Sequence, residues 1–227
     1  MKRLFFLLVI LSFSVSGTYA ASIVDSAHDL SGSSTFVSPS DSSIQYGSTD
    51  TDRLCVFCHT PHYAKTSAPL WNRSDVTLTD LVAYTSSTFD FTPDYTSGDV
   101  PLCMSCHDGD MTRALVNLNG AAPSAVLTPD SGNGRTLTIP GTAAALLGTD
   151  FTNDHPVGFV YDHNADSQNA LKDVTDAGVA ALLRGSNEVW CASCHNVHDP
   201  GTDVAGKAPF LRVANTRSDL CLTCHIK

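Results

Sequence analysis

The motif Cys-x-x-Cys-His occurs four times in this chain of 227 residues, and the four copies use all eight cysteines. They begin at Cys55, Cys103, Cys191 and Cys221. Two thiols separated by two residues can form thioethers with the two vinyl groups of one porphyrin, and the histidine that follows can bind its iron. The repeated motif therefore predicts a chain that folds around four covalently attached c-type haems.

Other uses of paired cysteines fit the pattern less well. A zinc ribbon needs no histidine directly after each pair, and a thioredoxin-like pair would occur once, beside a βαβ pattern. Structural disulfides would leave the four histidines unexplained. The expected haem attachment residues are Cys55, Cys58, Cys103, Cys106, Cys191, Cys194, Cys221 and Cys224, and the expected proximal iron ligands are His59, His107, His195 and His225.

The N-terminus has the features of a secretion signal. Lys2 and Arg3 precede an apolar run over residues 4–11, and small residues follow up to Ala20. The run is shorter than a membrane span, so we expect residues 1–20 to be a cleaved signal peptide. An uncleaved anchor is the alternative. The mature chain is expected to be exported, to the cell surface or the extracellular space or else the periplasm, without membrane insertion.

Charge and composition limit the partners and the fold class. The formal net charge is −10, and the acidic residues are 22 Asp and a single Glu. A strongly acidic chain disfavours nucleic acid and anionic membranes as partners. Because Asp favours turns and caps, and porphyrins supply apolar surface, we expect a loop-rich multihaem cytochrome c fold. It would have short helices and few strands wrapped around the four haems.

The motifs divide the mature chain, residues 21–227, into parts. The first and third motifs extend to Cys-x-x-Cys-His-x-x-His, at residues 55–62 and 191–198, whereas the second and fourth do not. We therefore expect a dihaem unit at 55–107, an insert at 108–190 and a second dihaem unit at 191–225. The Ser-, Thr- and Gly-rich residues 22–54 before the first unit are expected to be a flexible arm.

Local patterns suggest a few regular elements. Residues 124–139 have a hairpin pattern around Gly132-Asn133-Gly134. Residues 173–184 predict a short amphipathic helix, with Asp173 as its cap and Gly185 as its stop. Weak alternation over 76–91 suggests a strand pair.

Five histidines lie outside the proximal set and exceed the four irons by one. We expect His28, His62, His155 and His198 to be the distal ligands, with His163 to spare, although the choice among His28, His155 and His163 stays open. Methionine is a poor alternative, because Met1 leaves with the signal peptide and Met104 lies inside a motif, which leaves Met111. Four bis-histidine irons without a methionine ligand are expected to have low potentials.

Two of the distal candidates have informative spacing. His62 and His198 each lie three residues after a proximal histidine, so a helical segment would bring the two rings of each pair close together. One turn of backbone would then hold two different irons. His155 precedes Pro156, which restricts the backbone beside it.

The segments AHDLS (27–31), CVFCHTPH (55–62), DHPVGF (154–159), CASCHNVHD (191–199) and LCLTCH (220–225) carry a family resemblance. With them the chain resembles bacterial multihaem c-type cytochromes of the doubled Cys-x-x-Cys-His kind. It is most similar to the tetrahaem cytochromes that form extracellular filaments in metal-reducing bacteria.

This resemblance implies a continuous row of stacked haems, each with two histidine ligands, in a filament with little regular secondary structure. It also implies that one distal histidine comes from the neighbouring subunit, at a position matched by His62. His28 and His155 match distal positions within the subunit. The fifth histidine, His163, departs from the pattern.

The sequence therefore predicts electron transfer, with filament subunits and redox donors or acceptors as partners. A monomeric periplasmic tetrahaem shuttle would have the same haem chemistry and is the alternative. An enzyme would need an iron with an open position, and spare histidines outnumber the irons, so we expect no enzyme activity.

Overall fold

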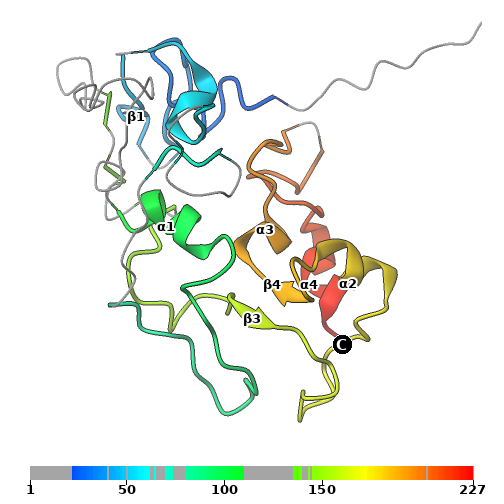
Figure 1. Cartoon of the computed structure of the whole chain (residues 1–227). Helices are drawn as coiled ribbons and strands as arrows, with labels where there is room; N and C mark the ends of the chain where they lie inside the picture. The colour runs from blue at the N-terminus through cyan, green and yellow to red at the C-terminus, as the bar shows by residue number, and fades with distance from the viewer. Residues whose placement is uncertain are drawn as a thin grey trace, which may run out of the picture.

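The computed structural model describes residues 22–39, 41–49, 51–61, 64, 70–73, 80–109, 135–136, 138–139, 143, 145–202 and 204–226. Within these residues the chain is mostly turns and loops with short regular elements (Figure 1). The elements are β1 (Gln45–Tyr46), η1 (Leu54–Phe57), α1 (Val100–His107), β2 (Arg135–Thr136), β3 (Phe159–Val160), α2 (Ala177–Leu182), β4 (Glu188–Val189), α3 (Cys191–Cys194), η3 (Thr216–Ser218) and α4 (Asp219–Cys224). The loop-rich character with few short helices and strands was expected, while residues 1–20, the expected signal peptide, lie outside the described residues.

Each of the four motifs begins in one of the short helices. The 3-10 helix η1 contains Cys55, and α1, α3 and α4 contain both cysteines of the second, third and fourth motifs. One helical turn places residues three apart on the same side of the backbone. The helices therefore turn the two thiols of each of these three motifs toward one common side.

Two small sheets join distant parts of the chain. In one, β1 pairs in parallel with β2; in the other, β3 pairs antiparallel with β4, with Phe159 opposite Val189. Figure 1 shows β3 and β4 close to α2, α3 and α4, while β1 lies with the N-terminal segment at the other end of the molecule. Both strands of the second sheet lie within the expected insert, and β4 ends two residues before Cys191 of the third motif.

The apolar core of the described residues falls into three small clusters. The first contains Leu30, Val56, Phe57, Ile139 and Ala143. The second contains Phe159, Tyr161, Val179, Leu183 and Val189, and the third contains Tyr95, Val100, Met104 and Phe151. Cys58 and Cys106 pack against the first cluster, Cys224 against the second and Cys191 against the third. Each cluster thus lies beside a motif.

The expectation of a flexible N-terminal arm is wrong. Residues 22–39 and 41–49 form successive turns, and Ser31 and Ser48 in them are almost completely buried. The buried Arg135 donates hydrogen bonds of 3.1 Å to the Ser31 carbonyl and 2.8 Å to the Ser34 carbonyl. A guanidinium offers donors in a fixed fork, so one side chain from β2 can bind several carbonyls of the segment. The polar residues that suggested a flexible arm therefore form these turns.

The predicted helix at 173–184 is shorter than expected and has a different cap. Its observed extent is α2, Ala177–Leu182, and the Asp176 carboxylate accepts hydrogen bonds from the amides of Gly178 and Val179. The Asp173 carboxylate instead binds the Thr175 amide and hydroxyl in the turn before the helix. Asp176 is therefore the cap, because its carboxylate reaches the unpaired amides of the first helical turn.

The other two predicted elements lie largely outside the described residues. The turn Gly132-Asn133-Gly134 lies outside the described residues, and the end of that segment, β2, pairs with β1. In the described part of 76–91, the ladder contact is a single bridge between Val82 and Asp150.

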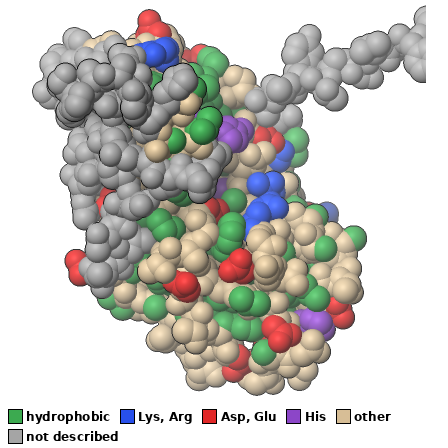
Figure 2. All heavy atoms as spheres, in the orientation of Figure 1, with side chains coloured by type: hydrophobic (Ala, Val, Ile, Leu, Met, Phe, Trp, Pro, Cys, Tyr) green, Lys and Arg blue, Asp and Glu red, His purple; other side chains and the backbone are tan. Residues whose placement is uncertain are grey.

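Surface charge is spread over the molecule. Figure 2 shows acidic side chains scattered over one face among polar and hydrophobic atoms, without gathering into one patch. Among the described residues, no helix has the length and hydropathy needed to cross a membrane.

Haem attachment should be required for folding. The three clusters of four or five residues bury too little apolar area to offset the conformational entropy of a chain this long. If the motifs hold haem, the free energy of attachment and ligation is also free energy of folding. A variant with all eight cysteines replaced by Ser should lack a cooperative transition in a thermal melt followed by circular dichroism. A sharp transition in that variant would contradict this expectation.

Candidate haem-binding centres

All eight cysteines are free thiols, and the first two motifs lie side by side. Burial raises the pKa of the Cys58 thiol to about 12, and the nearby Cys106 thiol raises this pKa further. Burial likewise raises the pKa of Cys106, while the guanidinium of Arg73 lowers it. Thiols that form no disulfide are available for covalent attachment.

The thiols of the second, third and fourth motifs are neighbours in the same order as the motifs occur along the chain. The Cys103 thiol is hydrogen-bonded to the Cys191 thiol, and this contact together with burial raises the pKa of Cys103 well above its ordinary value. Burial raises the pKa of Cys194 to about 11, and the charge of the nearby Cys224 thiol adds to the shift. Neighbouring thiols therefore link the first motif to the second, the second to the third, and the third to the fourth.

Three of the four expected proximal histidines have a second histidine ring opposite them. The ring centroids of His59 and His198 are 6.0 Å apart, those of His107 and His28 are 6.2 Å apart, and those of His225 and His155 are 6.2 Å apart. The first pair is nearly parallel, with 23° between the ring planes, whereas the other two pairs are close to perpendicular, at 74° and 78°. Each pair joins the histidine of one motif to a histidine outside the Cys-x-x-Cys-His set.

These separations fit two imidazoles on opposite faces of one iron. A metal–imidazole bond is about 2.0 Å long and the nitrogen lies about 1.1 Å from the ring centre, so two axial ligands have ring centres roughly 6.3 Å apart. Ordinary aromatic packing covers the same range of distances, so distance alone does not decide between the two. The composition of the pairs favours ligation, because every pair contains one motif histidine. The residues present therefore fit haem.

Four of these histidines are oriented by a backbone group. His107 Nδ1 donates to the Ala145 carbonyl at 2.7 Å, and His155 Nδ1 donates to the Pro156 carbonyl at 2.9 Å. The rings of His195 and His28 are hydrogen-bonded to the backbone of Pro209 and Val197. A ring that donates through one nitrogen presents the lone pair of the other, which is the usual arrangement for a metal-binding histidine.

Burial favours the neutral form of the distal candidates. The pKa of His28 falls to about 4, chiefly because of burial and then because of the nearby His107. The pKa of His155 is lowered by burial, although its hydrogen bond to Pro156 raises it. A neutral imidazole is the form that binds a metal ion.

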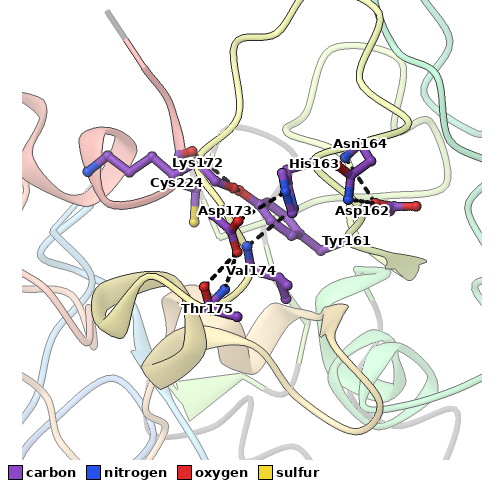
Figure 3. Close-up of polar contacts among 9 residues, drawn as sticks. All are labelled: Tyr161, Asp162, His163, Asn164, Lys172, Asp173, Val174, Thr175 and Cys224. Atoms are coloured by element: carbon purple, nitrogen blue, oxygen red, sulfur yellow. Dashed lines mark hydrogen bonds and ion pairs between the residues drawn. The ribbon is translucent and has the colours of Figure 1, made fainter.

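His163 has a different environment, in which both ring nitrogens are occupied (Figure 3). Nδ1 accepts a hydrogen bond of 3.3 Å from the Val174 amide, and Nε2 lies 3.3 Å from a carboxylate oxygen of Asp173. With Nδ1 accepting, the ring proton is on Nε2 and points at the carboxylate. Neither ring nitrogen offers a free lone pair to a metal, so the geometry favours His163 as the histidine that binds no iron.

The proximal His195 differs from the other three motif histidines. Among the described residues, no histidine ring lies opposite His195 at the separation found in the three pairs. His62, the fourth expected distal ligand, lies outside the described residues. His195 and His62 are thus the two expected ligands that the three pairs leave over.

The expectation that a helix brings His195 and His198 together is wrong. Helix α3 ends at Cys194, and His195 has the extended backbone angles φ −109° and ψ 142°. His195 pairs as an isolated bridge with Leu211, so its ring and that of His198 leave the backbone in different directions. As a result, His198 reaches back to His59 of the first dihaem unit.

Methionine has no access to an iron at the one described position. Met104 is completely buried in the third core cluster, within α1. Met1 and Met111 lie outside the described residues.

The sequence interpretation missed several side chains that surround the motifs. Phe210 stacks on His28 with ring centroids 4.4 Å apart, and Trp71 meets the edge of the His59 ring. Arg73 is buried between the first two motifs and donates to the Ser105 hydroxyl and carbonyl. Asp99 binds the third motif. These contacts join residues far apart in the sequence, so no local spacing announces them.

No model of a known protein family matches the chain, and no curated protein sequence matches it either.

The two histidines of the insert provide a matched pair for a test of the ligand set. We expect His155→Gln to remove one axial ligand, so that one of four haems becomes high-spin or takes a replacement ligand in the electron paramagnetic resonance spectrum. His163→Gln should leave the spectrum unchanged, because both nitrogens of that ring are held by Val174 and Asp173. The opposite pattern would reverse the assignment.

Proposed function

We propose that this protein is a tetrahaem c-type cytochrome that transfers electrons. The observation that carries the proposal is the set of three histidine pairs, each joining a Cys-x-x-Cys-His histidine to a second ring at 6.0–6.2 Å. A structural role for the histidines would not require this repeated combination. The free thiols beside them support attachment of one porphyrin per motif.

The chain's own groups would hold each haem in two ways. The two thiols of a motif would add to the two vinyl groups. In each addition the S–H bond and the π bond of the vinyl group would be replaced by one carbon–sulfur and one carbon–hydrogen bond, without a net change of oxidation state. Two histidine side chains would hold the iron, each oriented by its own surroundings. The bound haem supplies a one-electron couple, while burial and the nature of the axial ligands tune its potential.

The order of the motifs supports transfer along a single row. The neighbouring thiol pairs Cys58–Cys106, Cys103–Cys191 and Cys194–Cys224 link consecutive motifs. Electron tunnelling falls steeply with the separation of the cofactor edges, so neighbouring attachment sites favour short steps. A carrier is therefore favoured over an enzyme, because two histidine ligands for every iron would leave no position for a substrate.

We further propose that the protein is a subunit of an extracellular filament. His195 is the motif histidine without a second ring among the described residues, and His62 is the expected ligand that is left. His195 is exposed, as is the neighbouring Val197. A ligand from another copy can therefore approach this side of the molecule, and the resemblance to filament cytochromes assigns the shared ligand to His62.

The haem count tests the proposal directly. Protein exported by a host that attaches c-type haem should carry four haems by pyridine haemochrome assay and intact mass. Its oxidised electron paramagnetic resonance spectrum in the assembled state should contain low-spin signals alone. Fewer haems would remove the tetrahaem assignment, and a high-spin signal from a full equivalent of iron would favour an enzyme.

Replacement of His62 tests the filament. His62→Ala should leave four covalent haems per chain but one iron with a missing or replaced ligand, and electron microscopy should find short filaments or none. His163→Ala is the control and should assemble normally. Normal filaments of His62→Ala with all irons bis-histidine would exclude His62 as the bridging ligand. Purified wild-type protein that stays monomeric would favour the periplasmic shuttle.

A further inference from the structure

The carboxylate of Asp99 joins the two dihaem units. Asp99 precedes α1, which carries the second motif, yet its side chain binds the start of α3, which carries the third. One carboxylate oxygen accepts from the Cys191 amide at 3.0 Å, and the other accepts from the Ala192 amide at 2.7 Å. These amides lie 92 and 93 residues along the chain from Asp99. Both are among the first amides of a helix, which have no partner inside it.

Asp99 also binds the second motif, through its backbone. The Asp99 carbonyl accepts a backbone hydrogen bond of 3.0 Å from the amide of Cys103. A single residue therefore binds the first cysteine of the second motif through its backbone and the first cysteine of the third motif through its side chain. As a consequence, the carboxylate and the thiols of Cys103 and Cys191 all lie within 4.8 Å of one another.

Close packing beside Asp99 fixes the approach of the two segments. Gly98 has a positive φ of 64°, and a Cβ atom there would lie 2.4 Å from the indole of Trp190. Trp190 directly precedes Cys191, so the residues before the two motifs are in contact. This contact needs a glycine both for its backbone angle and for the space it leaves.

Two arginines hold the other side of the third motif. Arg184 Nε donates to the Ala192 carbonyl at 3.1 Å, and Arg212 Nε donates to the same carbonyl at 2.6 Å. The peptide groups of Ala192 are thus bound by an anion at the amide and by cations at the carbonyl. Opposite charges on the two sides restrict movement of the start of α3, since hydrogen bonds to charged groups are stronger than hydrogen bonds between neutral groups.

A metal ion is a poor explanation of the Asp99, Cys103 and Cys191 cluster. Two amides occupy both carboxylate oxygens, and the proposed thioethers use both thiols. A structural link between the motifs accounts for every polar group of the cluster.

We propose that Asp99 is the positioning residue that sets the contact between the second and third haems, and hence electron transfer between the two dihaem units. The inference rests on the proposed function, because it concerns haems attached at Cys103 and Cys191. The Cys103 and Cys191 sulfurs lie close together, so porphyrins bonded to them would also lie close together. A small shift of α3 relative to α1 would therefore change the separation of the two porphyrins. Of the three contacts between motifs, this is the one that joins the two halves of the row.

Replacement of Asp99 in the full, haem-loaded protein tests the inference. Asp99→Ala removes both acceptors, whereas Asp99→Asn keeps one acceptor oxygen. Asp94→Ala is the matched control, because the Asp94 carboxylate accepts two hydrogen bonds from Thr96 of its own exposed turn and none from the third motif. The readouts are the haem count, the low-spin resonance spectrum, and the two-signed Soret circular dichroism band that haems in contact give in the reduced protein.

We expect four low-spin haems in every variant, with the two-signed band weakened in Asp99→Ala, intermediate in Asp99→Asn and unchanged in Asp94→Ala. If Asp99→Ala fails to mature, the comparison of Asp99→Asn with Asp94→Ala decides. An unchanged band in both Asp99 variants, or no such band in tetrahaem wild type, would overturn the positioning role while leaving the proposed function in place. Absence of haem from the wild type would instead remove the proposed function.

Discussion

The structure depends on three pairs of imidazoles whose ring centres lie 6.0–6.2 Å apart. Each pair draws on two distant segments: His28 meets His107, His59 meets His198, and His155 meets His225. The described residues hold three small apolar clusters, and the imidazole pairs add contacts that bring the N-terminal segment and the insert to the motifs. The backbone groups that bind His28, His107 and His155 orient the rings and leave one nitrogen of each free. On this account the loops supply the backbone groups that orient the haem ligands.

The same constraint explains why regular structure is so limited. A helix long enough to form a bundle would separate a motif from its distal histidine, whereas a short helix followed by extended backbone lets the ring turn toward its partner. His195 and His225 both take extended backbone angles directly after the helix that carries their cysteines. At the junction of the two units, the carboxylate of Asp99 before α1 binds the first amides of the short helix α3.

Local chemistry was predictable from the sequence, whereas the choice of distant partners was not. The four motifs and the loop-rich character follow from residue types, counts and spacing. The order of His28 and its neighbours did not follow, because the carbonyl of the buried Ser31 is bound by Arg135, about a hundred residues away. The helix cap was misplaced by three residues, since Asp173 and Asp176 have the same local signature and the Thr175 turn takes Asp173. Asp99 looks like a cap for its own helix, and its partners lie beyond the reach of any local pattern.

The central claim is that these histidine pairs share irons, and an electron cryo-microscopy map of the haem-loaded protein tests it most directly. The account predicts iron density between the rings of His59 and His198, of His28 and His107, and of His155 and His225. It also predicts a fourth iron between His195 and one further imidazole, with His163 remaining beside Asp173. Iron bound to His163, or any of the three pairs divided between different irons, would contradict it.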